Sequence, residues 1–167
     1  LATNVATSIV TVDGLVDNGT TLTVNAVNLT TASLNFDGSA ETNGNFSITG
    51  GTVNDTITGS AGNDTINAGN GNNIVTAGAG NDSLLGGTGA DTFILAGNLT
   101  SVDTITGGAG TDTLTFTDNG LATTDLNNVT AVEVITLGDA VTEVKTVDAL
   151  VALTTTLTVD GSALTSA

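Results

Sequence analysis

The sequence predicts an all-β protein built as a parallel β-solenoid, and three observations support this fold class. The 167-residue chain has 22 glycines, only four aromatic residues, all phenylalanine, and no proline, cysteine or histidine. Nine-residue rows recur through its middle, and short apolar–polar alternations flank them. Thin layers of Val, Ile, Leu and Ala suit this composition better than a core built around large aromatic side chains.

The central rows share one register. They read GGTVNDTIT, GSAGNDTIN, AGNGNNIVT, AGAGNDSLL and GGTGADTFI from residues 50, 59, 68, 77 and 86, then NLTSVDTIT from 98 and GGAGTDTLT from 107. Three residues, 95–97, interrupt the register. Every row has Asp or Asn at position 6 and an apolar residue at position 8, and most have small residues at positions 1, 2 and 4.

A six-residue turn followed by a three-residue strand explains each row. Glycine permits positive φ, Asp and Asn favour turns, and the apolar position 8 points inward. Two rows then make one coil, and parallel stacking at about 4.8 Å places each position-8 side chain on its counterpart in the next coil. The sequence therefore predicts two apolar stacks that face each other.

The flanking segments are also predicted to be β-structure. Leu22-Thr23-Val24, Leu34-Asn35-Phe36 and Phe46-Ser47-Ile48 alternate at a spacing of twelve residues, which favours longer, irregular half-coils of the same solenoid. A β-sandwich-like arrangement of these strands is the alternative. We divide the chain into a Thr/Asn-rich segment (1–49), a nonapeptide block (50–116) and a Thr/Val-rich segment (117–167) that begins the next unit.

A longer repeat supports that division. Residues 24–42 align without gaps with residues 147–165, a shift of 123, and nine of nineteen positions are identical, including the segment DGSA. SIVTV (8–12) resembles EVITL (133–137) at a shift of 125. The chain is therefore interpreted as a slice of a tandem array, about one and a third units long.

The charge points to a cation partner. Seventeen acidic residues face a single cationic residue, Lys145, and the formal net charge is −16. Self-repulsion opposes compaction until bound cations relieve it. The same charge argues against nucleic acid, anionic membranes and acidic polysaccharides. We also expect neither a targeting segment nor a membrane anchor.

The position-6 residues are the candidate metal ligands. In the stacked coils Asp55, Asn73 and Asp91 fall on one edge, and Asp64 and Asp82 on the other. Two carboxylates near 5 Å repel by roughly 3–4 kcal/mol at an effective dielectric constant of about 20. Calcium would relieve this repulsion with carboxylate and glycine-turn carbonyl oxygens. The alternative is that position 6 only shapes the turn, a role that Asn fills equally well.

These rows resemble the calcium-binding nonapeptide of RTX (hemolysin-type) proteins over residues 50–94 and 98–115. The resemblance implies a parallel β-roll, Ca²⁺ between successive turns, type I secretion and folding outside the cell. Carried onto this sequence, it implies metal ligands at Asp55, Asp64, Asn73, Asp82, Asp91, Asp103, Asp112, Gly59, Gly69, Gly71, Gly78, Gly80, Gly87, Gly89, Gly108 and Gly110. The row at 50 has valine in place of the glycine at position 4, and the row at 98 lacks the glycines.

The expected role is structural. A long repeat that combines these rows with Thr-rich strands looks like bacterial surface-layer proteins and very large secreted adhesins, at the cell surface or in a biofilm matrix. The expected partner is another copy, in a filament or lattice, and a cell-surface polysaccharide is a second candidate. The alternative is a calcium-dependent folding and secretion module of an extracellular enzyme. We expect no catalysis in this segment, because it lacks His, Cys, Tyr and Arg.

Overall fold

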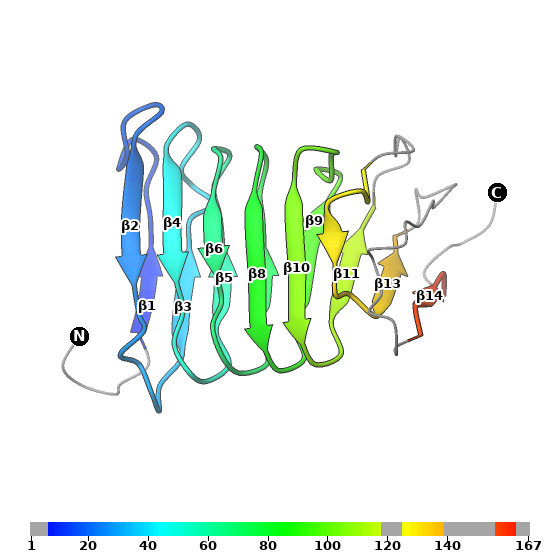
Figure 1. The fold of residues 1–167 in the computed structure, drawn as a ribbon. Helices are drawn as coiled ribbons and strands as arrows, with labels where there is room; N and C mark the ends of the chain where they lie inside the picture. Colours follow the sequence, from blue (N-terminus) through cyan, green and yellow to red (C-terminus); the bar gives the residue numbers. More distant parts are fainter. Residues whose placement is uncertain (1–6, 118–124, 139–155, 163–167) are drawn as a thin grey trace.

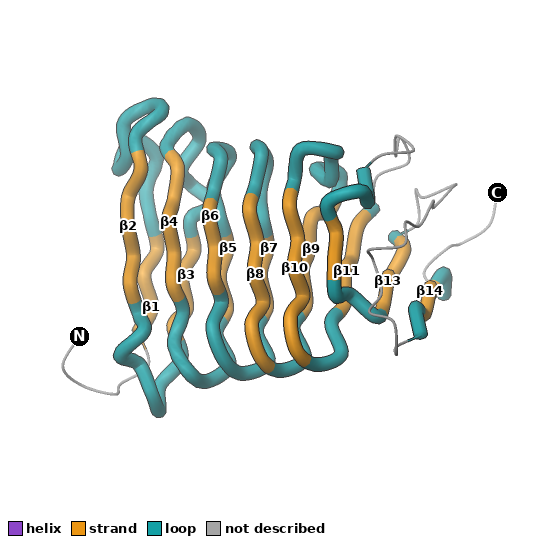
Figure 2. The backbone as a smooth tube through the Cα atoms, in the orientation of Figure 1, coloured by secondary structure: helices purple, strands orange, loops and turns teal. Residues whose placement is uncertain are grey.

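The computed structural model describes residues 7–117, 125–138 and 156–162 as a two-layered stack of β-strands (Figures 1 and 2). The strands are β1 (Thr7–Val10), β2 (Thr21–Asn25), β3 (Leu34–Asp37), β4 (Asn45–Thr49), β5 (Thr56–Thr58), β6 (Thr65–Asn67), β7 (Ile74–Thr76), β8 (Ser83–Thr88), β9 (Thr92–Ala96), β10 (Thr104–Ala109), β11 (Thr113–Phe116), β12 (Val129–Thr130), β13 (Val134–Leu137) and β14 (Thr158–Asp160). Within these residues there is no helix long and apolar enough to cross a membrane.

The strands form two parallel sheets, and the chain passes from one sheet to the other at almost every turn. The eight-stranded sheet has the order β1-β3-β5-β7-β9-β11-β13-β14, and the six-stranded sheet has the order β12-β10-β8-β6-β4-β2. Each consecutive pair from β1–β2 to β11–β12 therefore makes one coil, six coils in all. The predicted all-β parallel solenoid is confirmed.

Coil length changes along the molecule while the strand register is kept. Ile57 pairs with Val75, and Val75 with Phe93, so coils in the nonapeptide block are 18 residues long. Outside the block, Phe36 pairs with Ile57 across 21 residues, and Leu22 pairs with Phe46 across 24. The extra residues lie in the turns. The described flanks thus continue the solenoid, and the sandwich alternative does not apply to them.

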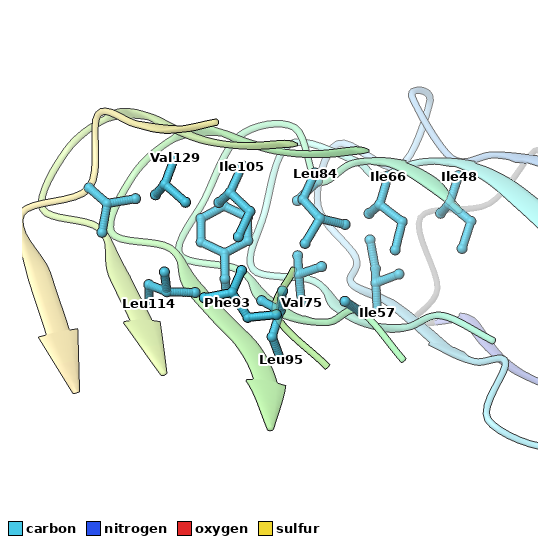
Figure 3. Close-up of a cluster of buried hydrophobic side chains, with 14 of the residues drawn as sticks. Ile48, Ile57, Ile66, Val75, Leu84, Phe93, Leu95, Ile105, Leu114 and Val129 are labelled. Carbon is cyan, nitrogen blue, oxygen red and sulfur yellow. The ribbon is translucent and has the colours of Figure 1, made fainter. Parts of the chain in front are cut away.

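Two stacks of apolar side chains fill the space between the sheets (Figure 3). One stack comes from the six-stranded sheet and the other from the eight-stranded sheet. The first contains Ile48, Ile66, Leu84, Ile105 and Val129, and the second contains Ile57, Val75, Phe93 and Leu114, all at most 1% exposed. Near the first coils Phe36 and Phe46 meet edge to face, with ring centroids 5.0 Å apart. Position 8 of every row is therefore the core position, as predicted.

The core is open at its first coil. Ile9, Leu22 and Val24 point inward but are only partly buried, although they pack against fully buried neighbours. Leu22 and Val24 pair with Phe46 and Ile48, which are each 1% exposed. The difference in burial follows from position alone, because no coil stands outside β1 and β2 in the described chain.

The strand pair β13–β14 repeats the pair β1–β3. Asn35 pairs with Ser8, and its repeat equivalent Thr158, 123 residues later, pairs with Val134. Ser8 is therefore equivalent to Val134, a shift of 126, so the alignment of SIVTV with EVITL at a shift of 125 is wrong by one residue. Apolar letters match at either shift, but a one-residue slip would turn every side chain to the opposite face. Most of the repeat segment 147–165 lies outside the described residues.

Candidate metal centre

The position-6 residues lie in the turns that lead into each strand of the nonapeptide block. Each side chain is at most 3% exposed: Asp55, Asp64, Asn73, Asp82, Asp91, Asp103 and Asp112. The A edge, at the bottom of Figure 1, carries Asp55, Asn73, Asp91 and Asp112 before strands of the eight-stranded sheet. The B edge carries Asp64, Asp82 and Asp103 before strands of the six-stranded sheet. The turns thus place buried acidic groups in two rows along the solenoid.

One oxygen of each position-6 side chain forms a ladder between coils. It accepts the backbone N–H of the position-6 residue, or its equivalent, in the preceding coil. The A-edge donor–acceptor pairs are Leu34 N to Asp55 Oδ1, Asp55 N to Asn73 Oδ1, Asn73 N to Asp91 Oδ1 and Asp91 N to Asp112 Oδ1, at 2.7–2.8 Å. The B-edge pairs are Phe46 N to Asp64 Oδ1, Asp64 N to Asp82 Oδ1 and Asp82 N to Asp103 Oδ1, at 2.7–2.9 Å. Asn73 serves as well as Asp does, so this ladder does not by itself require a carboxylate.

The sequence analysis missed Glu133, which continues the A-edge ladder. Its Oε2 accepts the Asp112 N–H at 2.8 Å, and its side chain is buried. The signal was present in the sequence, because Glu133-Val134-Ile135 follows Asp112-Thr113-Leu114 by 21 residues, the length of the coil before it. The segment around Glu133 has no nonapeptide pattern, so the longer side chain was not recognised as a substitute for Asp.

A second ladder runs along the outer side of the turns. Asn63, Asn72 and their equivalents occupy position 5, and each exposed amide oxygen accepts an N–H from the following coil. Asn54 Oδ1, for example, accepts the N–H of Asn72 at 2.8 Å. The asparagines of position 5 therefore hold neighbouring turns together from outside, while position 6 holds them from inside.

The second carboxylate oxygen separates the turns into two classes. In three rows, called closed turns, Oδ2 accepts hydrogen bonds from its own turn. Gly51 N donates to Asp55 Oδ2 at 2.6 Å, and Ser60 donates to Asp64 Oδ2 through both N (2.6 Å) and Oγ (3.1 Å). Thr100 donates to Asp103 Oδ2 through N (2.8 Å) and Oγ1 (3.1 Å). Ser60 and Thr100 were not singled out from the sequence.

Three other rows, called open turns, have a different backbone. Asp82, Asp91 and Asp112 follow turns with glycines of positive φ at positions 2 and 4. These glycines are Gly78, Gly80, Gly87, Gly89, Gly108 and Gly110, with φ between 100° and 148°. Oδ2 of Asp91 and Oδ2 of Asp112 are buried and have no hydrogen-bond partner. A buried polar atom without a partner is costly, so these turns are prepared for a group that the described residues do not supply.

Replacing Gly89 by alanine is expected to damage an open turn. Gly89 has φ of 121°, and a Cβ there would collide with the carbonyl oxygen of Gly71 in the preceding coil. The left-handed backbone alone costs roughly 1–2 kcal/mol for a residue with a Cβ, and the collision adds to it. Gly97→Ala is the control, because nothing lies within 4 Å of its added Cβ. Urea unfolding should separate the two variants; equal midpoints would contradict the close stacking of the turns.

Burial raises the pKa of several of these carboxyl groups. It is the largest cause at Asp82, whose pKa rises to about 7, and at Asp112, whose pKa rises to about 6. Neighbouring acids add to the effect: Asp64 and Asp103 act on Asp82, and Asp91 and Glu133 act on Asp112. The hydrogen bond from the neighbouring backbone N–H only partly offsets it. Positive charge at these turns would be favourable.

The available donors fit calcium. No three acidic side chains come together within the described ranges, so a cation would take one carboxylate with backbone carbonyl oxygens. Those oxygens are close at hand, since a Cβ on Gly89 or Gly110 would meet the carbonyl of Gly71 or Gly89 in the preceding turn. The chain has no His or Cys to offer nitrogen or sulfur ligands. A hard cation that prefers six to eight oxygens matches this set.

Comparison with known families agrees with this chemistry. Residues 49–84, 68–97 and 100–117 match the RTX calcium-binding nonapeptide repeat, in four copies. Searches of curated proteins and of solved structures gave no match. RTX nonapeptide repeats bind Ca²⁺, form structural β-rolls that are generally not catalytic, and are typical of type I-secreted extracellular proteins. The central block of this chain, residues 49–117, is therefore a set of RTX calcium-binding nonapeptide repeats.

Proposed function

We propose that the chain is a calcium-dependent structural repeat of an extracellular bacterial array, such as a surface layer, a matrix filament or a giant adhesin. The observation that carries this proposal is the repetition of the β1–β3 pair by β13–β14 in the same sheet and register. One unit thus spans six coils, from β1 to β12, and the next unit begins without a break in the eight-stranded sheet. A folding module that ends an enzyme has no need to begin its unit again.

The open first coil supports the same proposal. Ile9, Leu22 and Val24 would become fully buried if a preceding unit placed its β11- and β12-type strands beside β1 and β2. Leu114 shows the fit, because it pairs with Ile135, the equivalent of Ile9. In a solenoid each coil is stabilised by its neighbours, so joined units gain buried apolar surface at each junction. The partner is accordingly another unit of the same kind.

The proposal predicts that joined units form one rod. In a two-unit chain, residues 8–167 would replace residues 134–167, which keeps the observed register at the junction. Small-angle X-ray scattering in calcium should show a single particle about 29 Å longer than the one-unit chain, for six coils of about 4.8 Å each. Two bodies joined flexibly would contradict a continuous solenoid.

Assembly is tested on the same two-unit chain by negative-stain electron microscopy. Ordered filaments or sheets are expected in calcium and should disappear after chelation, because unrelieved negative charge then opposes association. Dispersed rods in both conditions would contradict the array and favour the folding module. Asp64→Asn is a useful comparison, since it removes one charge but leaves the amide oxygen to serve the ladder.

A further inference from the structure

We propose that calcium is held only at the open turns of Asp82, Asp91 and Asp112, and that hydrogen-bond donors take the place of the cation in the other four rows. This divides a repeat whose rows look alike in sequence. It predicts fewer ions than the seven position-6 residues would suggest. It concerns single turns, so it holds whether or not the units assemble.

The open turns have an unmet requirement at a defined atom. Oδ2 of Asp91 and Oδ2 of Asp112 are buried without partners. Each lies against the position-1 glycine of its own turn, because a Cβ on Gly86 or Gly107 would collide with it. The neighbouring backbone carbonyls are acceptors and cannot donate a hydrogen bond to a carboxylate. A cation satisfies both kinds of oxygen at once.

Asp82 is grouped with them on its turn geometry. Gly78 and Gly80 have φ of 100° and 116°, as in the two turns just described. The hydrogen bond that its side chain accepts comes from Asp64 N and reaches Oδ1. Its turn has no counterpart of the Ser60 or Thr100 hydroxyl, because Gly78 and Ala79 stand at positions 2 and 3.

The closed turns already meet this requirement with their own atoms. Asp64 illustrates it best, since Ser60 supplies both a backbone N–H and a hydroxyl to Oδ2. The Ser60 hydroxyl also donates toward the carbonyl oxygen of Gly44 at 2.9 Å, so it bridges a carboxylate and a carbonyl. Those are the two oxygen types that an ion would join. Loading calcium here would first require breaking short hydrogen bonds, which makes binding unfavourable relative to an open turn.

Asn73 shows a third way to replace the ion. Its turn has the open backbone, with Gly69 and Gly71 at φ of 94° and 98°. Its amide differs from a carboxylate at one atom, and that atom, Nδ2, donates to the carbonyl oxygen of Gly71 at 3.2 Å. A neutral donor thus stands where an open turn has an oxygen without a partner. Asn73→Asp would restore the carboxylate in a turn that is otherwise ready for calcium.

Native mass spectrometry of the full chain in calcium tests the assignment by counting bound ions. The wild type should hold three. Asp112→Asn should hold two, whereas Asp55→Asn, which removes the same charge from a closed turn, should still hold three. Both variants keep an oxygen for the ladder bond, and circular dichroism checks that each is folded. Asn73→Asp should gain an ion and hold four.

Either of two outcomes would overturn the proposal. One is loss of an ion in Asp55→Asn equal to that in Asp112→Asn, which would mean that closed turns also bind calcium. The other is an unchanged count in Asn73→Asp, which would mean that the open backbone and a carboxylate are not sufficient. The count is made on single chains, so a failure of assembly would not affect it.

Discussion

Calcium-free protein is expected to lose stability as the pH rises from about 5 to about 8, and saturating calcium is expected to restore it. The pKa of Asp82 is about 7 and that of Asp112 about 6 in the folded chain, whereas an unfolded aspartate titrates near 3.9. Between these values the folded state binds more protons than the unfolded state. Stability therefore falls with rising pH across this window, in the sense opposite to that of an aspartate in a salt bridge.

Calcium changes the sign of this dependence. Where an ion replaces the protons, each site adds about 2.7 kcal/mol at a free concentration a hundred times its dissociation constant. Protons compete for the same oxygens, so the apparent affinity should fall as the pH drops below about 7. The chain is therefore expected to require calcium most at neutral and alkaline pH.

Urea unfolding of the dialysed, calcium-free protein at several pH values measures the first effect. Asp82→Asn is the matched variant, because it keeps an oxygen for the ladder but removes the titrating group, and its pH dependence should be flatter. A midpoint that rises with pH in the calcium-free wild type would contradict the assignment of buried, cation-free carboxylates.

Phe93→Ala is expected to lower the free energy of unfolding by about 3–5 kcal/mol. The side chain is fully buried in β9, and its ring extends toward the stack of the opposite sheet (Figure 3). It pairs with Val75 on one side and Leu114 on the other. Both neighbours are held by their own strand ladders, so the cavity cannot readily collapse.

Ile74→Val is the control for this substitution. Ile74 lies on the adjacent strand β7, and its side chain is 45% exposed on the outer face of the same sheet. Removing one methyl group there should change stability by less than about 0.5 kcal/mol. Urea unfolding in calcium measures both variants. Similar losses would mean that the core stack contributes little beyond the strand ladders.

The sequence predicted the solenoid because its information is periodic. Ile57, Ile66 and Val75 recur every nine residues, and no other β-architecture places that period on alternating sheets. The flanks were harder, since Leu22 and Phe46 are 24 residues apart and a sandwich would show the same alternation. The register of β1 against β13 could not be fixed, because SIVTV and EVITL match at two shifts that bury opposite faces.

The candidate site was predicted at the level of residue type and edge, but its two classes were not. Asp64 and Asp91 occupy the same row position, and the difference between them depends on where a neighbouring N–H points. That direction is set by φ at position 2, where Ser60 and Gly87 differ. Asn73 was read as the loss of a charge, whereas its amide donates a hydrogen bond. Glu133 was missed because the turn before it is irregular.

The coiled path also determines how the molecule responds to a pulling force. Strands β1 and β14 lie at opposite ends of the stack (Figure 1), and the hydrogen bonds between parallel strands run roughly along the line that joins them. Tension along that line would open the stack from an end, one coil after another, instead of shearing all strands together. An 18-residue coil occupies about 4.8 Å of the stack but about 60 Å when drawn out. Each coil that opens would therefore lengthen the chain more than tenfold and limit the peak force that the remaining coils carry.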